Sequence, residues 1–205
     1  YHNHQETGEF ILVNDGFGYN LWLGNLPGTI KLYEGDFASK EENQAFADYY
    51  WGTVQKEKLA ELEQSDNFSS LTIKEREKVW TREALKNITA DFGFTARLMV
   101  GKLKAFWTPF LNRFSYGNTV VNLIAMFVIA TYVLGLYGMY VFFKDKTGRS
   151  YVLLLILTFL VTTAIHVLIF GFVRYRVPNV DPYLSMLTGV AVWQIFARFL
   201  PQLDS

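Results

Sequence analysis

The sequence of 205 residues contains no cysteine, only five prolines and only three histidines. Without cysteine, disulfide bonds and thiolate chemistry are excluded. His2 and His4 lie at the start of the chain, and no His, Asp or Glu cluster has the spacing of a metal site. A glycine-rich phosphate loop and a nucleophile elbow are also missing. We therefore expect no metal, no cofactor and no catalytic residue of a familiar motif.

Charge is missing from one long stretch and is divided unevenly over the rest. Residues 114–143 carry no Asp, Glu, Lys or Arg. Residues 1–117 have a formal net charge of −3, and residues 118–205 have +3. No strong basic field exists for the phosphates of a nucleic acid. The division predicts a water-exposed region over 1–117 and a membrane region over 118–205, so that membrane lipids are partners and nucleic acid is not.

Three apolar stretches predict membrane-spanning helices, because about 20 apolar residues suffice to cross a bilayer. They lie near 119–143, 150–173 and 183–200. Ser185 and Gly189 form a pair of small residues four positions apart, a pattern that favours helix packing in membranes. The predicted fold is a mainly α, polytopic membrane fragment.

The region before the first span is predicted to be mostly helical. Ser39 with Glu42 and Thr72 with Glu75 have the spacing of capping boxes. These signals predict helices over 39–64 and from Thr72 to about Ile88, and a third helix runs from Ala90 to Trp107.

A small extended element is expected near the start of the chain. Residues 9–13 are apolar and β-prone, and residues 20–28 give a second extended piece. Gly16 and Gly18 between them read as turn residues.

The segment near 90–110 is predicted to lie at the membrane interface. Leu98, Lys102 and Phe106 recur every four residues, and lysines flank Phe106 and Trp107. Basic and aromatic side chains together suit the headgroup region. An ordinary amphipathic helix on a water-soluble core has the same pattern.

Two arginines follow the second apolar stretch. Arg174 and Arg176 bracket Tyr175, and the connector to the next span is stiffened by Pro178 and Pro182. The planar guanidinium matches phosphate oxygens, so we expect this segment to bind a phosphate-bearing substrate. The alternative is that both arginines reach the lipid headgroups as anchors. Asp181 can pair with either arginine.

His166 is a further candidate for substrate binding. It belongs to a series with a spacing of four residues that leads to Arg174. A histidine inside a span faces protein or a water-filled cavity. The series therefore fits a path toward the arginine segment, and it fits equally a structural histidine held by a neighbouring helix.

Three separate patches of the sequence form a recognisable series: GEFILV (8–13) with GYNLWLGNLPG (18–28), KLKAFWTP (102–109), and RYRVP (174–178) with Pro182 and Tyr183. In this order they resemble the C-type glycosyltransferases of membranes, the relatives of dolichyl-phosphate-mannose protein mannosyltransferases and of the lipid A aminoarabinose transferase. Leu26 departs from the family pattern, which often has a second Asn there, and this puts a polar role for that turn in doubt.

The resemblance implies the C-terminal fragment of a bacterial inner-membrane enzyme, with residues 1–117 outside the cytoplasm. Such an enzyme moves a sugar from a polyprenyl-phosphate donor to an acceptor on the outer face. The family's catalytic acidic residue would lie upstream of Tyr1, in the remainder of the same chain, so the fragment alone is expected to be inactive. The resemblance implicates Arg174 and Arg176 at the donor phosphate. We expect Tyr175 or His166 to shape the adjoining cavity. The alternative function is a non-catalytic membrane protein, such as a transporter half or an assembly partner.

Overall fold

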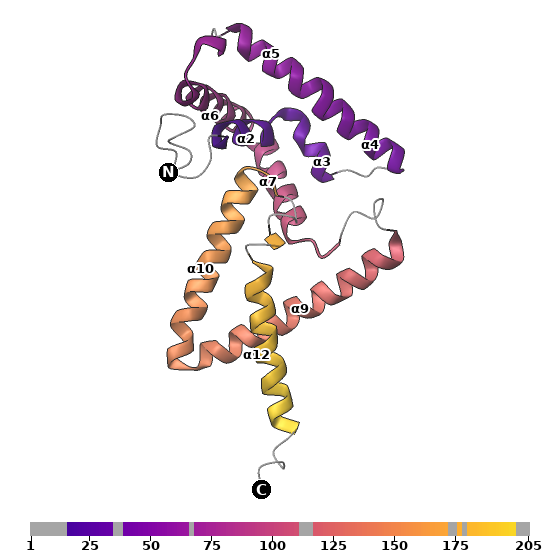
Figure 1. Cartoon of the computed structure of the whole chain (residues 1–205), viewed down its shortest axis with the longest axis vertical. Helices are drawn as coiled ribbons and strands as arrows, with labels where there is room; N and C mark the ends of the chain where they lie inside the picture. The colour runs from indigo at the N-terminus through magenta and orange to yellow at the C-terminus, as the bar shows by residue number, and fades with distance from the viewer. Residues whose placement is uncertain are drawn as a thin grey trace. The chain divides into compact units, whose positions relative to one another are not determined.

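The structure is a computed structural model that describes residues 16–34, 39–65, 68–110, 117–171, 176–177 and 180–199 (Figure 1). Over these ranges the chain is almost entirely helical and contains no strand. The mainly α prediction is confirmed. The expected strand at 9–13 lies outside the described residues.

The chain divides into two compact units. Unit 1 takes in the residues up to Lys102 together with Leu168–Phe170. Unit 2 takes in 103–167 and the residues from Gly171 onward. One helix, α7 (Phe92–Trp107), runs from the first unit into the second.

Short and medium helices build unit 1. Before α7 they are, in chain order, α2 (Phe17–Gly24), η1 (Pro27–Ile30), α3 (Lys31–Glu34), α4 (Lys40–Tyr49), the π-helical turn η2 (Tyr50–Val54), α5 (Gln55–Ser65), η3 (Phe68–Ser70) and α6 (Ile73–Ala90).

The predicted caps form. The Ser39 hydroxyl accepts a hydrogen bond from the Glu42 N–H at 3.1 Å. At α6 the box is complete: the Thr72 N–H donates to Glu75 Oε2 at 2.9 Å, and the Glu75 N–H donates back to Thr72 Oγ1 at 3.4 Å. Each cap satisfies amide groups that the first helical turn leaves without a partner.

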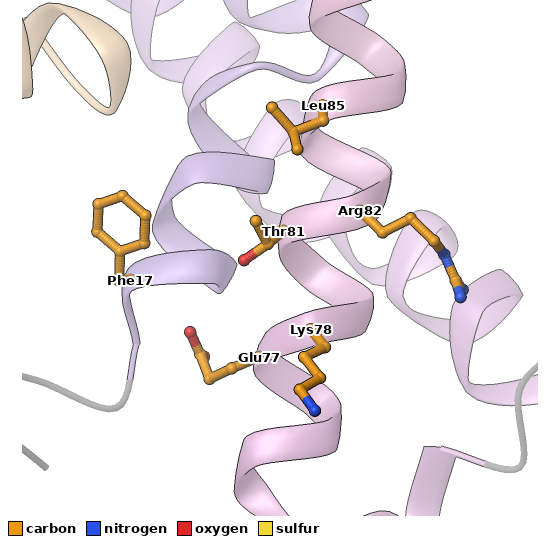
Figure 2. Close-up of a pocket in the computed structure, with 6 residues that line it drawn as sticks. All are labelled: Phe17, Glu77, Lys78, Thr81, Arg82 and Leu85. Atoms are coloured by element: carbon orange, nitrogen blue, oxygen red, sulfur yellow. The ribbon is translucent and has the colours of Figure 1, made fainter.

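The expected extended piece at 20–28 is wrong, because α2 and η1 occupy it. Gly18 is a packing residue rather than a turn residue: a Cβ there would lie 2.6 Å from the Glu77 carbonyl oxygen, so only glycine lets α2 approach α6 this closely. The Gly18 N–H donates to Glu77 Oε2 at 2.6 Å. Figure 2 shows Glu77 and Thr81 of α6 pointing toward α2. Tertiary packing thus overrides the local turn signals.

An aromatic cluster forms the core between α2 and α6. Trp80 lies 4.7 Å from Trp22, 5.2 Å from Tyr19 and 4.9 Å from Phe68, measured between ring centroids. Trp22 and Trp80 are both buried. Edge-to-face and tilted pairs of this kind are favourable arrangements of aromatic rings. The cluster fixes the helix that leads into the turn at Asn25.

Tyr50 contacts residues on both sides of the turn at Asn25. Its hydroxyl contacts the Thr29 hydroxyl and donates to the Leu23 carbonyl at 3.3 Å. Burial raises the pKa of Tyr50 to about 12. The π-helical turn at η2 is where this side chain enters the fold, and such turns insert one extra residue into a helix.

Two long helices dominate unit 2. They are α9 (Asn118–Lys144) and α10 (Lys146–Leu168), and both are long and apolar enough to cross a membrane. The chain reverses between them within one residue, Asp145, whose carboxylate accepts from the Gly148 N–H at 2.7 Å. An aspartate at this position satisfies an amide that the first turn of α10 leaves without a partner, and its negative charge is favourable at a helix N-terminus.

The prediction of a third membrane span is wrong when its helix is judged by length and apolarity, as α9 and α10 were. The segment does form a helix, α12 (Asp181–Phe199), but only α9 and α10 among the described residues qualify as membrane spans. The physical reason is composition: Asp181, Gln194 and Arg198 interrupt a helix of 19 residues, which leaves no window apolar enough.

Helix α12 packs against α9 instead. The close contact is made by Gly135 and Gly138 of α9, where a Cβ at Gly138 would lie 2.1 Å from the Leu187 carbonyl oxygen. The Thr188 hydroxyl donates across the interface to the Thr131 carbonyl at 3.1 Å. Gly189, for which a packing role was predicted, takes no part in this contact: among the described residues, nothing lies within 4 Å of a Cβ placed there.

Candidate functional site

Arg176 is the centre of a buried polar cluster in unit 2. Its side chain is 2% exposed. Nε donates to Asp181 Oδ1 at 2.8 Å, and Nη1 donates to the carbonyl oxygens of Phe106 and Thr108 at 3.1 Å and 3.0 Å. The guanidinium also lies over the Tyr132 ring, 5.3 Å from its centroid. A guanidinium suits this set because its donors form a rigid planar fork.

The cluster connects three parts of unit 2. Asp181 begins α12, Tyr132 belongs to α9, and Phe106 lies in the last turn of α7. Phe106 itself is fully buried and belongs to a core that includes Phe159, Val180 and Leu184. Arg176 therefore ties the last turn of α7 to the start of α12.

His166 reaches the same core from α10. Its ring stacks on Phe106, with the ring centroids 5.8 Å apart and the planes 18° from parallel. Two of the predicted site residues, His166 and Arg176, are thus brought to one residue, Phe106. Arg174 and Tyr175 lie outside the described residues. Of the two carboxylate pairings left open by the sequence, the structure contains the one between Asp181 and Arg176.

A second buried cation lies in unit 1. Lys102 is fully buried, and its Nζ donates to Asn25 Oδ1 at 3.0 Å and to the Leu168 carbonyl at 3.3 Å. Asn25 in turn donates through Nδ2 to the carbonyl oxygens of Leu21 and Leu168, at 2.7 Å and 2.8 Å. This network joins the end of α2, the middle of α7 and the last residue of α10.

The acceptors around the Lys102 ammonium are neutral. Burial without a carboxylate lowers the pKa of Lys102 to about 7, from an ordinary value of 10.5. A lysine in this setting exchanges its proton near neutral pH, unlike a lysine on the surface. The close backbone approach beside it explains Gly24, where a Cβ would lie 2.0 Å from the Ile169 carbonyl oxygen.

Sequence reasoning placed Lys102 among the lysines at the membrane interface and missed its burial. The available signal was its register, since Leu98, Lys102 and Phe106 share one helix stripe and all three are buried. Asn25 was predicted only as part of the extended piece at 20–28. Its partner is the backbone carbonyl of Leu168, and because every residue has a backbone carbonyl, the sequence gives no sign of this contact.

The described surface also has a shallow groove between α2 and α6, of about 570 Å³. Figure 2 shows its lining residues, of which Phe17 and Leu85 are the apolar ones and Lys78 and Arg82 point away from α2. The groove holds none of the predicted site residues, so the Arg176 cluster and the Lys102 network are the better candidates.

No group of three or more His, Cys, Asp or Glu side chains that could hold a metal ion occurs in the part of the chain that the structure describes. Comparison of the chain with protein-family models, with curated proteins and with solved structures gives no match.

Proposed function

We propose that this chain is part of a membrane glycosyltransferase that moves a sugar from a polyprenyl-phosphate donor to an acceptor. In such a reaction the bond between the anomeric carbon and the phosphate oxygen breaks, a bond to the acceptor forms, and the polyprenyl phosphate leaves. On the resemblance, an acidic residue takes the acceptor's proton, and we assign that role to no residue of this sequence.

The observation that carries the proposal is that the patches on which the resemblance rests contact one another. Asn25 of the first patch accepts a hydrogen bond from Lys102 of the second. Phe106 and Thr108 of the second patch accept hydrogen bonds from Arg176 of the third. The patches lie about 70 residues apart in the sequence, and a buried basic side chain joins each patch to the next. Such contacts are expected if the three patches together support one structure.

A membrane location has separate support. Helices α9 and α10 are long and apolar enough to cross a bilayer, and most of their large apolar side chains point away from the protein, among them Phe127, Leu136 and Leu160. The core helix of a water-soluble protein would bury these side chains, whereas a lipid-facing helix exposes them.

The two arginines take different roles in this proposal. Arg176 braces the segment from inside, because Asp181 and two carbonyl oxygens occupy its donors. Of the two arginines that the resemblance implicates, Arg174 is then the one that we propose for the donor phosphate, because the guanidinium of Arg176 is buried. A lipid anchor would keep its guanidinium at the surface, and the burial of Arg176 argues against that alternative for this residue.

The proposal is tested with the full-length protein in proteoliposomes. A polyprenyl-phosphate sugar labelled in the sugar is supplied in one sample, and the corresponding labelled nucleotide sugar in another. We expect the label to leave the polyprenyl phosphate when a membrane extract provides acceptors, and to stay on the nucleotide. A protein that leaves both donors intact, or uses only the nucleotide sugar, would contradict the proposal.

A further inference from the structure

Helix α7 carries an apolar face that nothing in the described structure covers. Phe92 is 84% exposed, Val100 50% and Leu103 43%, and Ala96 between them is also exposed. Their spacing of four, four and three residues places them on one side of the helix. A different stripe of the helix, formed by Leu98, Lys102 and Phe106, is buried.

This face is not the one that sequence periodicity indicated. The stripe of Leu98, Lys102 and Phe106 points into the protein, and the exposed stripe is purely apolar. Lys104 lies at the edge of the exposed stripe, as does Arg97, which pairs with Glu34 at 2.9 Å. An apolar stripe edged by basic side chains is the composition of a helix that lies in a membrane surface.

The position of α7 along the chain limits what can cover the face. Leu168, the last residue of α10, bonds through its carbonyl to Lys102 in the middle of α7. The first turn of α9 begins at Asn118, eleven residues after Trp107, so the chain between them spans at most about 40 Å. Two crossings by α9 and α10 return the chain to the side on which it entered. Helix α7 therefore touches the end of one membrane span and shortly precedes the start of the other.

We propose that α7 lies in the plane of the membrane and inserts Phe92, Ala96, Val100 and Leu103 into the boundary between lipid headgroups and acyl chains. The occupant of the exposed face is then the phospholipid bilayer, and Lys104 reaches the headgroups from its edge. The inference depends on α9 and α10 crossing the membrane and is independent of sugar transfer.

The absence of cysteine makes a direct test simple, because single-cysteine variants need no background changes. Ala96→Cys and Val100→Cys of the whole chain are spin-labelled in phospholipid vesicles. Ala60→Cys is the matched control, because Ala60 is an exposed alanine on α5. Collision of each label with oxygen, which concentrates in lipid, and with a water-soluble nickel chelate gives its depth.

We expect the labels at 96 and 100 to lie about 5–10 Å below the headgroup level, with oxygen collisions favoured, and the label at 60 to favour the nickel chelate. Labels at 96 and 100 that collide with nickel as freely as the control would mean that the face is in water. Labels protected from both reagents would mean that protein covers it. Either result would overturn the inference, whatever the protein's activity.

Discussion

Two basic side chains of this protein, Arg176 and Lys102, are buried, and they have different hydrogen-bond partners. Arg176 has a carboxylate partner in Asp181 at 2.8 Å, whereas Lys102 has only an amide oxygen and a carbonyl. A buried charge without a counter-charge opposes folding, and a paired one is costly mainly when its partner is removed. The two sites therefore predict different behaviour on mutation.

Lys102 should make stability depend on pH above neutrality. Its folded pKa of about 7 lies below its ordinary value of 10.5. Between these values the unfolded chain holds one proton more, so the contribution of Lys102 makes the free energy of unfolding rise with pH, by up to about 1.4 kcal/mol per pH unit. Below pH 7 both states are protonated and the contribution is flat.

Lys102→Met should remove this rise. Methionine keeps the volume and discards the desolvation cost, but it leaves Asn25 Oδ1 without its donor, which costs about 1–3 kcal/mol. The difference from the parent at pH 7 is therefore small, and the pH slope is the decisive readout. Denaturant unfolding of the full chain in micelles at pH 7 to 9.5 measures it. Equal slopes for parent and variant would refute the burial of a titrating ammonium.

Replacing Arg176 should lower the free energy of unfolding. Arg176→Lys keeps the charge, but one ammonium does not reproduce a fork that serves Asp181, Phe106 and Thr108, so we expect a loss of about 1–3 kcal/mol. Arg176→Ala leaves the Asp181 carboxylate unpaired and should cost more, about 3–5 kcal/mol. The free energy of unfolding of the full chain measures both. Arg198→Lys, at an exposed arginine near the end of α12, is the control. Parent-like stability of Arg176→Lys would show that the fork is not needed.

At the scale of elements, glycine contacts set how closely the helices approach. The contact between α9 and α12 depends on Gly138, which faces the backbone of Leu187, and not on Gly189. Because the facing atom is a backbone oxygen, it does not swing aside as the end of a side chain would.

Gly138→Ala should therefore force α9 and α12 apart and destabilise the chain by about 1–3 kcal/mol. Gly189→Ala is the matched change on the other helix. Nothing lies near its Cβ, so it should be neutral or slightly stabilising through helix propensity. Thermal midpoints of the two variants in micelles distinguish these outcomes. A harmless Gly138→Ala, or a harmful Gly189→Ala, would contradict the packing described.

For the molecule as a whole, local sequence signals correctly predicted where helices begin. They gave wrong predictions at residues whose position depends on contacts with distant parts of the chain. The Thr72 and Glu75 box and the long uncharged stretch that became α9 depend on neighbours in sequence, and both were predicted correctly. Gly18 and Lys102 depend on α6 and on the end of α10, about 60 and 66 residues away. A glycine reads as a turn and a lysine as a surface residue until those partners are known.

The candidate site follows the same division. The sequence predicted that Asp181 could pair with an arginine, because the residues are close in the chain. It did not predict that carbonyl oxygens of α7 and its following turn would occupy Arg176, since backbone acceptors carry no residue signature. The roles of Arg174 and Tyr175 in binding the donor stay predictions.

The most direct test of the proposed sugar transfer is the dependence of its rate on polyprenyl-phosphate donor concentration in full-length Arg174→Lys, with Arg198→Lys as the matched control at equal membrane insertion. A charge-assisted bond to phosphate contributes about 1.5–3 kcal/mol, which corresponds to roughly one to two decades in affinity. Lysine retains part of this through its charge and loses the bidentate contact. We expect the curve for Arg174→Lys to shift to higher donor concentration, while that of Arg198→Lys matches the parent. An Arg174→Lys curve that overlays the parent would contradict the role of Arg174 at the donor phosphate.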